Sequence, residues 1–209
     1  MAEDKSLRIK LILGATKGKL VRFSHLHVFS PRLNKESGKL DYSLAVLIPK
    51  TNTEDIAAVK KAIAELTAAE WTSKKKKLPP NFWNPLRDGD TDTKQNGDPM
   101  AAECKGHMVL NVKTSATDAD GNDMPAPNVV GIVKDAQGKL VKLGSREVKS
   151  GDWGRVGVHM GAYVKGNGGV GGYITNVQRV QEGEALSSHA SAEDDFGDFT
   201  DDEEDALFN

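Results

Sequence analysis

The body of the chain is a series of short β-forming segments interrupted by a single helical one. Aromatic and β-branched residues dominate 22–29, and the apolar run at 41–48 is typical of a more buried strand. Turn residues between the two predict a hairpin. Further strands are expected at 107–115, 129–133, 139–143, 153–163 and 173–180. This pattern favours a mainly β barrel with one main helix over a parallel sheet.

Helical periodicity is confined to one segment. Thr53 can cap a helix whose apolar residues, from Ile56 to Leu66, recur at helical spacing and which runs to about Trp71. Residues 1–19 are predicted to be a leader. Residues 78–99 are rich in Pro, Asn, Asp and Gly and are expected to form an extended loop.

The last nineteen residues carry charge of one sign. Residues 191–209 contain nine acidic and no basic residues, with phenylalanines among them. The chain has 28 Lys and Arg against 30 Asp and Glu, but residues 1–190 have 28 against 21, a formal charge of +7. Such acidic blocks stay disordered and often act as interaction arms. The tail is expected to compete for the body's basic surface or to offer its Phe residues to a partner. A tail that only aids solubility is the alternative.

The sequence also indicates in which cellular compartment the protein is expected. No apolar run approaches the ~20 residues that span a bilayer, and the charged start of the chain lacks the apolar stretch of a secretory signal. The single cysteine, Cys104, excludes an intrachain disulfide and fits a reducing environment. We therefore expect a cytoplasmic protein with no membrane contact.

The strongest candidate binding surface lies on the segment 153–163. Alternation places Trp153, Arg155, His159 and Tyr163 on one face, with small glycines between them. Aromatic side chains and a cation on a flat sheet surface are suited to base stacking, which contributes roughly 1–3 kcal/mol per base and tolerates any sequence. The alternative is a second hydrophobic layer beneath a loop or a partner subunit.

A second candidate surface combines cations with aromatic residues in and before the extended loop. Lysines neutralise phosphates without regard to sequence, although a lysine run alone is more often a solvated face. Beside an aromatic pair in a basic body, the run is a reasonable nucleic-acid patch. Its members are Lys74, Lys75, Lys76, Lys77, Phe82, Trp83 and Arg87.

Signals of catalysis are weak. The glycine-rich stretch 166–172 lacks the Lys-Ser/Thr ending of a phosphate loop and precedes a strand. Cys104 and His107 have half the spacing of a zinc site, but no second cysteine exists. The aspartates of the 88–98 loop could hold a metal, which leaves open a metal-dependent nuclease or recombination enzyme. A structural assembly protein is the other alternative. We expect no enzyme, cofactor or metal.

Five motifs in order give the chain a family resemblance. They are Phe29-Ser-Pro31, Tyr42-Ser-Leu-Ala-Val-Leu-Ile-Pro-Lys50, Leu86-Arg-Asp-Gly-Asp90, Gly154-Arg-Val-Gly-Val-His-Met-Gly-Ala-Tyr163 and Gly172-Tyr-Ile-Thr-Asn-Val-Gln-Arg-Val180. Together, over roughly residues 20–186, they resemble a family of phage replicative single-stranded DNA-binding proteins with an OB-fold.

The resemblance implies a mainly β OB-fold domain at 1–186 with one main α-helix, and a disordered acidic tail at 187–209. It implies binding of single-stranded DNA without sequence specificity, in phage DNA replication, recombination or repair in the host cytoplasm. Arg22 and Phe23 of the leading strand join the expected DNA contacts. Whether the protein is a homodimer is left open.

The resemblance also gives the tail a role. In such proteins the acidic tail competes with DNA for the groove and recruits replication enzymes, here polymerase or helicase-primase. The implied partner-binding residues are Asp201, Asp202, Glu203, Glu204, Asp205 and Phe208. One departure is that related tails often end in the aromatic residue, whereas here Asn209 follows Phe208.

Overall fold

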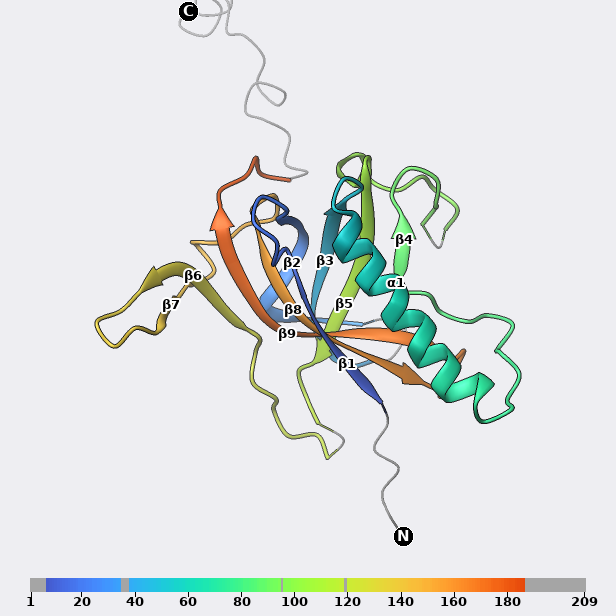
Figure 1. The fold of residues 1–209 in the computed structure, drawn as a ribbon. Coiled ribbons are helices and arrows are strands. Elements are labelled where there is room, and N and C mark those ends of the chain that lie inside the picture. The colour runs from blue at the N-terminus through green and yellow to red at the C-terminus, as the bar shows by residue number, and fades with distance from the viewer. Residues whose placement is uncertain (1–6, 35–37, 95, 119, 187–209) are drawn as a thin grey trace, which may run out of the picture.

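All the strands of the described chain join one sheet, which curls into a barrel (Figure 1). The computed structural model describes residues 7–34, 38–94, 96–118 and 120–186. The strands are β1 (Arg8–Leu13), β2 (Val21–Leu33), β3 (Leu40–Pro49), β4 (Leu86–Asp88), β5 (His107–Ser115), β6 (Asn128–Lys134), β7 (Leu140–Lys142), β8 (Trp153–Tyr163) and β9 (Gly169–Gln181). The helices are α1 (Thr53–Thr67), a π-helical turn at Ala68–Thr72 and a 3-10 turn at Ala102–Cys104.

Five of the strands close on themselves. β2 pairs with β3, β3 with β5 and β9 with β8, all antiparallel, while β5 and β9 pair in parallel. The pairing of β8 with β2 completes the ring. β1 extends the sheet from β8, and the β6–β7 hairpin extends it from β9. This mostly β, OB-like sheet with one main helix confirms the expected fold class.

The barrel interior is filled by one side of each strand. On β8, Val156, Val158 and Met160 are fully buried, as their alternation predicts. α1 packs against β1, β8 and β9, and it buries Val59 and Leu66. The helix lies along one side of the barrel (Figure 1).

Four local expectations are corrected by the structure. The supposed leader contains β1, because its apolar run can pair along β8. Asn52 rather than Thr53 caps α1, with its side chain accepting a hydrogen bond from the Asp55 N–H. The extended loop includes β4, which pairs with β5. β9 begins at Gly169, inside the glycine-rich stretch, because residues without side chains still pair along β8.

The tail predicted at 187–209, with its acidic residues and Phe208, lies outside the described residues. None of the described helices is long and apolar enough to cross a bilayer.

Candidate nucleic-acid interface

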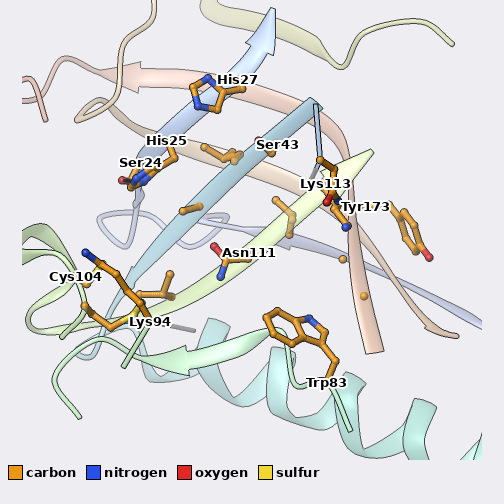
Figure 2. Close-up of a pocket in the computed structure, with 18 of the residues that line it drawn as sticks. Ser24, His25, His27, Ser43, Trp83, Lys94, Cys104, Asn111, Lys113 and Tyr173 are labelled. Atoms are coloured by element: carbon orange, nitrogen blue, oxygen red, sulfur yellow. Dashed lines mark hydrogen bonds between the residues drawn. The ribbon is translucent and has the colours of Figure 1, made fainter. Parts of the chain in front are cut away.

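A groove of about 910 Å³ crosses the outer face of β3 and β5. Residues of β2 and of the loop between β8 and β9 line it. Figure 2 shows His25 and His27 along β2, with Trp83 across the floor from them. Along the chain the five barrel strands are β2, β3, β5, β8 and β9, so β3 and β5 are the second and third. The loop from β8 to β9 joins the fourth strand to the fifth. Asn34, which follows β2 at the start of the loop from the first strand to the second, also lines the groove. In OB-folds this face and these two loops are where oligonucleotides bind.

The groove floor is made by the outward side chains of two paired strands. Ser43 lies opposite Lys113, and Ala45 opposite Asn111. Asn111 and Lys113 are exposed, whereas Val112 between them is buried in the barrel core. The floor therefore presents an amide and an ammonium group to the groove, while the alternate residues hold the barrel together.

One end of the floor is apolar. Ala45, Leu47 and Val109 form a small cluster on the outside of the barrel with Cys104 from the 3-10 turn. Leu186, the last described residue, packs against this cluster, and its N–H donates to the Ser150 carbonyl oxygen at 3.0 Å. The chain thus leaves the described body at the apolar end of the groove.

Trp83 forms a wall of the groove and is held by its backbone. Its N–H donates to the Gly168 carbonyl oxygen at 3.0 Å, and its carbonyl oxygen accepts from the Val170 N–H at 3.1 Å. An added Cβ at Gly169 would come within 2.5 Å of that same oxygen. The close approach requires glycine here and leaves the half-buried indole directed into the groove (Figure 2).

The charge of the groove is positive. Lys94, Lys113 and Lys165 line it, and among the described lining residues there is no Asp or Glu. Lys113 lies 3.7 Å from Asp41. Lys94 and Lys165 have no ion-pair partner within the described part of the chain. Lys94 and Lys165 are thus available to phosphates, and a phosphate would compete with Asp41 for Lys113.

Two titratable groups of the groove are held in their neutral forms. Burial, followed by the Glu103 charge, raises the pKa of the Cys104 thiol. Burial, followed by the Arg32 and His25 charges, lowers the pKa of His27. A protonated thiol is a poor nucleophile, so Cys104 contributes packing and not covalent chemistry.

Of the four residues predicted to bind bases on β8, the structure brings only one to the groove. Tyr163 lines the groove, but Trp153, Arg155 and His159 are not among its lining residues. The Arg22 guanidinium lies 5.7 Å from the centre of the Trp153 ring. Trp153 therefore covers an arginine on the outside of the barrel.

The predicted contacts on β2 have structural roles. The Arg22 side chain donates to the carbonyl oxygens of Gly151 and Glu184 at 3.2 and 3.1 Å, which fastens the C-terminal arm to β2. Phe23 is fully buried in the core and has no surface to offer a base. The expected DNA contact of Phe23 is thus incompatible with its burial, because its inward position on β2 is needed for the barrel core.

The loop patch is divided too. Only Trp83 of its seven residues lines the groove. Phe82 packs edge-on against Trp71, with ring centres 5.4 Å apart. Glu70 binds Lys74 at 2.6 Å and Lys76 at 2.7 Å. Lys75 and Lys77 are exposed and lie outside the groove.

The aspartate loop is neutralised by the protein's own cations. The Lys50 ammonium lies 2.6 Å from both Asp88 and Asp90, and Arg87 lies 2.9 Å from Asp92. The hydrogen bond from Lys50 is the main cause that holds the pKa of each of its two carboxyls below the ordinary value. Nowhere in the described ranges are three or more His, Cys, Asp or Glu arranged to hold a metal.

Sequence reasoning missed most of the groove. Lys94, Lys113, Lys165 and Asn111 are isolated polar residues in segments with no motif of their own. The outward position of Asn111 and Lys113 could have been read from the alternation of the strand at 107–115. Nothing in the sequence around Lys94 or Lys165 indicates a binding residue, because only the folded chain brings their two loops to the same groove.

The sequence and the fold find counterparts among known proteins. The family model described as "Enterobacter phage Enc34, ssDNA-binding protein" matches residues 10–207. No curated protein sequence matches the chain.

Solved structures of single-stranded DNA-binding proteins from two phages share the fold. The single-stranded DNA-binding protein from bacteriophage Enc34 in complex with ssDNA superimposes with a TM-score of 0.62 at 19% identity, over 86% of this chain and 89% of that one. Gp2.5, a single-stranded DNA-binding protein encoded by bacteriophage T7, superimposes with a TM-score of 0.52 at 14% identity, over 94% and 96%.

Proposed function

The chain belongs to the family of phage single-stranded DNA-binding proteins described for Enterobacter phage Enc34, and we propose that it holds the single strand in the groove across β3 and β5. The observation that carries this proposal is the gathering of Lys94, Lys113 and Lys165 around a groove without acidic lining among the described residues. Family membership agrees with the expectation that the chain is not an enzyme, and the paired aspartates give a nuclease no support.

The groove supplies both elements that non-specific binding needs. The lysines neutralise phosphates, which makes affinity fall with salt but leaves it independent of sequence. Trp83 and Tyr163 line the same groove and can stack on bases, each of which has a π face. Asn111 on the floor can donate to or accept from a base edge. The strand would thus run between the lysines with its bases toward the aromatic wall.

We infer a regulatory role for the acidic tail from where it starts. Leu186 packs on the cluster at the apolar end of the groove, and five residues later the acidic segment begins. Nine carboxylates starting there can occupy the lysines when no DNA is bound. When DNA displaces the tail, its carboxylates and Phe208 become available to replication proteins such as polymerase or helicase-primase.

The biological setting belongs to the same proposal. A phage protein that coats single strands acts in DNA replication, recombination or repair, in the cytoplasm of the host cell. Sequestering strands by phosphate and stacking contacts requires no catalysis and no cofactor.

Titration with oligo-dT and with a duplex of equal length tests the groove. We expect tight binding of the single strand at low salt and weakening as salt rises, with quenching of Trp83 fluorescence. A Trp83→Phe variant should bind but lose most of the quenching, because Trp71 is buried and Trp153 covers Arg22. Absence of oligo-dT binding at low salt would refute the proposed function.

Deletion of residues 191–209 tests the tail separately. We expect tighter single-strand binding at low salt, because nine carboxylates no longer compete with phosphates. The difference between the truncated and full chains should shrink as salt screens the charges. Equal or weaker affinity of the truncated chain at low salt would show that the tail does not occupy the groove.

A further inference from the structure

A β-bulge interrupts β2 where it borders the groove. Ser24 pairs with Ala45 and His27 with Ser43, so β2 has one more residue than β3 between these pairs. His25, within the bulge, has a φ of +49°. Residues other than glycine rarely adopt this left-handed conformation, and where they do, a functional constraint is a common cause.

The bulge brings an additional side chain to the groove. Phe23 and Val28 are fully buried, and Leu26 packs against the same core. Ser24, His25 and His27 all line the groove. In a regular strand, neighbours such as Ser24 and His25 would face opposite sides. The extra residue therefore adds an imidazole to the groove without removing an apolar side chain from the core.

Hydrogen bonds hold the bulge in this form. The Leu26 N–H donates to the Ser150 Oγ at 3.1 Å. The Ser24 Oγ donates to Glu103 Oε1 at 3.4 Å and lies 2.9 Å from His25 Nδ1. A hydroxyl has one hydrogen, so a Ser24 that donates to Glu103 accepts from the Nδ1–H of His25. The ring of His25 is exposed, so it remains available to a ligand in the groove.

We propose that His25 and His27 form a base-contacting subsite at the β2 border of the groove, where the two rings contact nucleobases of the bound single strand. This inference rests on the proposed function and extends it from the lysines and aromatic wall to the opposite border. His25 stacks on a base and can hydrogen-bond to the base edge through Nε2, and His27 lines the adjacent position.

The surroundings favour bases over phosphates at this border. Ala45, which pairs with Ser24 beside His25, lines the groove, and Met100 and Ala101 pack against the cluster that contains Ala45, so this border has apolar surface that suits a base ring. The lowered pKa of His27 agrees with an uncharged ring at neutral pH. Figure 2 shows the two rings spaced along β2, with Asn111 on the floor between β2 and the Trp83 wall.

His25→Gly and His25→Asn test the subsite without disturbing the backbone. Glycine and asparagine both accept a positive φ, so the bulge is retained and its strain is relieved or unchanged. Loss of one stacked base corresponds to a reduction of about fivefold or more in oligo-dC affinity. His159→Ala is the matched control, because it removes a histidine of β8 outside the groove.

We expect both His25 variants to bind oligo-dC about fivefold or more weakly, with melting temperatures equal to or above that of the full-length parent. On an abasic strand of the same length, parent and variants should bind alike. His159→Ala should match the parent throughout.

Parental affinity in either His25 variant would overturn the subsite. Weakening that accompanies a lowered melting temperature, or that persists equally on the abasic strand, would overturn it as well. If the parent binds single strands and Lys94→Ala with Lys165→Ala weakens that binding, such a result refutes the subsite alone and leaves the proposed function intact.

Discussion

Two sets of lysines in this protein differ in what surrounds them. Lys74–Lys77 are consecutive in sequence, but Glu70 neutralises two of them and none lines the groove. Lys94, Lys113 and Lys165 are scattered in sequence, yet they surround one groove whose described lining has no carboxylate. Density of charge along a chain is therefore a poor guide to a phosphate-binding surface. What matters is how closely carboxylates pair with the cations that the fold brings together: Lys94 and Lys165 have no ion-pair partner among the described residues, and Lys113 lies 3.7 Å from Asp41.

The largest expected effect comes from removing two groove lysines together. Lys94→Ala with Lys165→Ala should make the dependence of log affinity on log salt shallower by about 1.4, because each lost phosphate contact on a single strand removes ~0.7. At 0.1 M salt this corresponds to roughly 25-fold weaker binding. Fluorescence anisotropy with labelled oligo-dT over a salt series measures both quantities.

The matched control is Lys75→Ala with Lys77→Ala, which removes the same charge from the exposed run outside the groove. Its salt slope should stay at the parental value. If this pair lowered affinity as much as the groove pair, the distinction between the two lysine sets would be wrong.

A second contrast is between two tryptophans. Trp83→Ala should weaken binding about tenfold, within the 1–3 kcal/mol of one stacked base, because its indole lines the groove. Trp153→Ala removes a ring that covers Arg22 outside the groove and should change the melting temperature more than the affinity. The same oligo-dT titration, with thermal unfolding of both variants, separates them. If Trp153→Ala lost more affinity than Trp83→Ala, the outer face of β8 would be part of the DNA-binding surface after all.

A smaller effect on affinity, with a clear effect on stability, is expected for Gly169→Ala. The new methyl group would meet the Trp83 backbone, and the φ of +156° is strained for any residue with a side chain. We expect a loss of about 2 kcal/mol or more in the free energy of unfolding and several-fold weaker binding, because the Trp83 wall must move. Denaturant unfolding measures the first. Gly166→Ala, where an added Cβ meets nothing within 4 Å but φ is +65°, controls for the strain alone.

The smallest effect on DNA binding is expected from the paired aspartates. Asp88 and Asp90 have pKa values held below 3.8 in the folded protein, chiefly by hydrogen bonds from Lys50. Their contribution to stability is therefore present above about pH 4 and is lost as pH falls through the lowered values. Lys50→Met should lower the melting temperature at neutral pH, by an amount that vanishes in strong acid.

Single-strand affinity of Lys50→Met should equal that of the parent, because Lys50 lies outside the groove. A melting-temperature difference that persisted unchanged into strong acid would show that Lys50 acts through packing and not through these carboxylates.

Much of the fold was predictable because it follows from local patterns. The strands near 41–48, 107–115 and 153–163 match β3, β5 and β8, since alternation and β-branched residues mark them. The helix was placed correctly by its apolar spacing. β1 was missed because it is an edge strand whose partner, β8, lies far along the chain.

The candidate site was predictable only in part. Alternation correctly separated the buried Val156, Val158 and Met160 from the other side of β8. It did not indicate that the outer side of β8 turns away from the groove, so that only Tyr163 at its end reaches it. The barrel curves, and the direction of an outward face depends on closure through β2 and β9.

The sequence by itself determined most of the strands, the single main helix, the charge contrast between body and tail, and the family. These depend on residue composition, short-range periodicity and ordered motifs, which need no knowledge of distant contacts. Only the tertiary structure decided which cations are neutralised, which aromatic rings are buried, and that a bulge brings His25 to the groove. Such outcomes depend on pairings between segments far apart in the chain, such as Trp83 with Gly169 and β2 with β3. Phe23 illustrates the difference. An aromatic ring can stack on a base, but the inward position of Phe23 on β2 buries its ring in the barrel core.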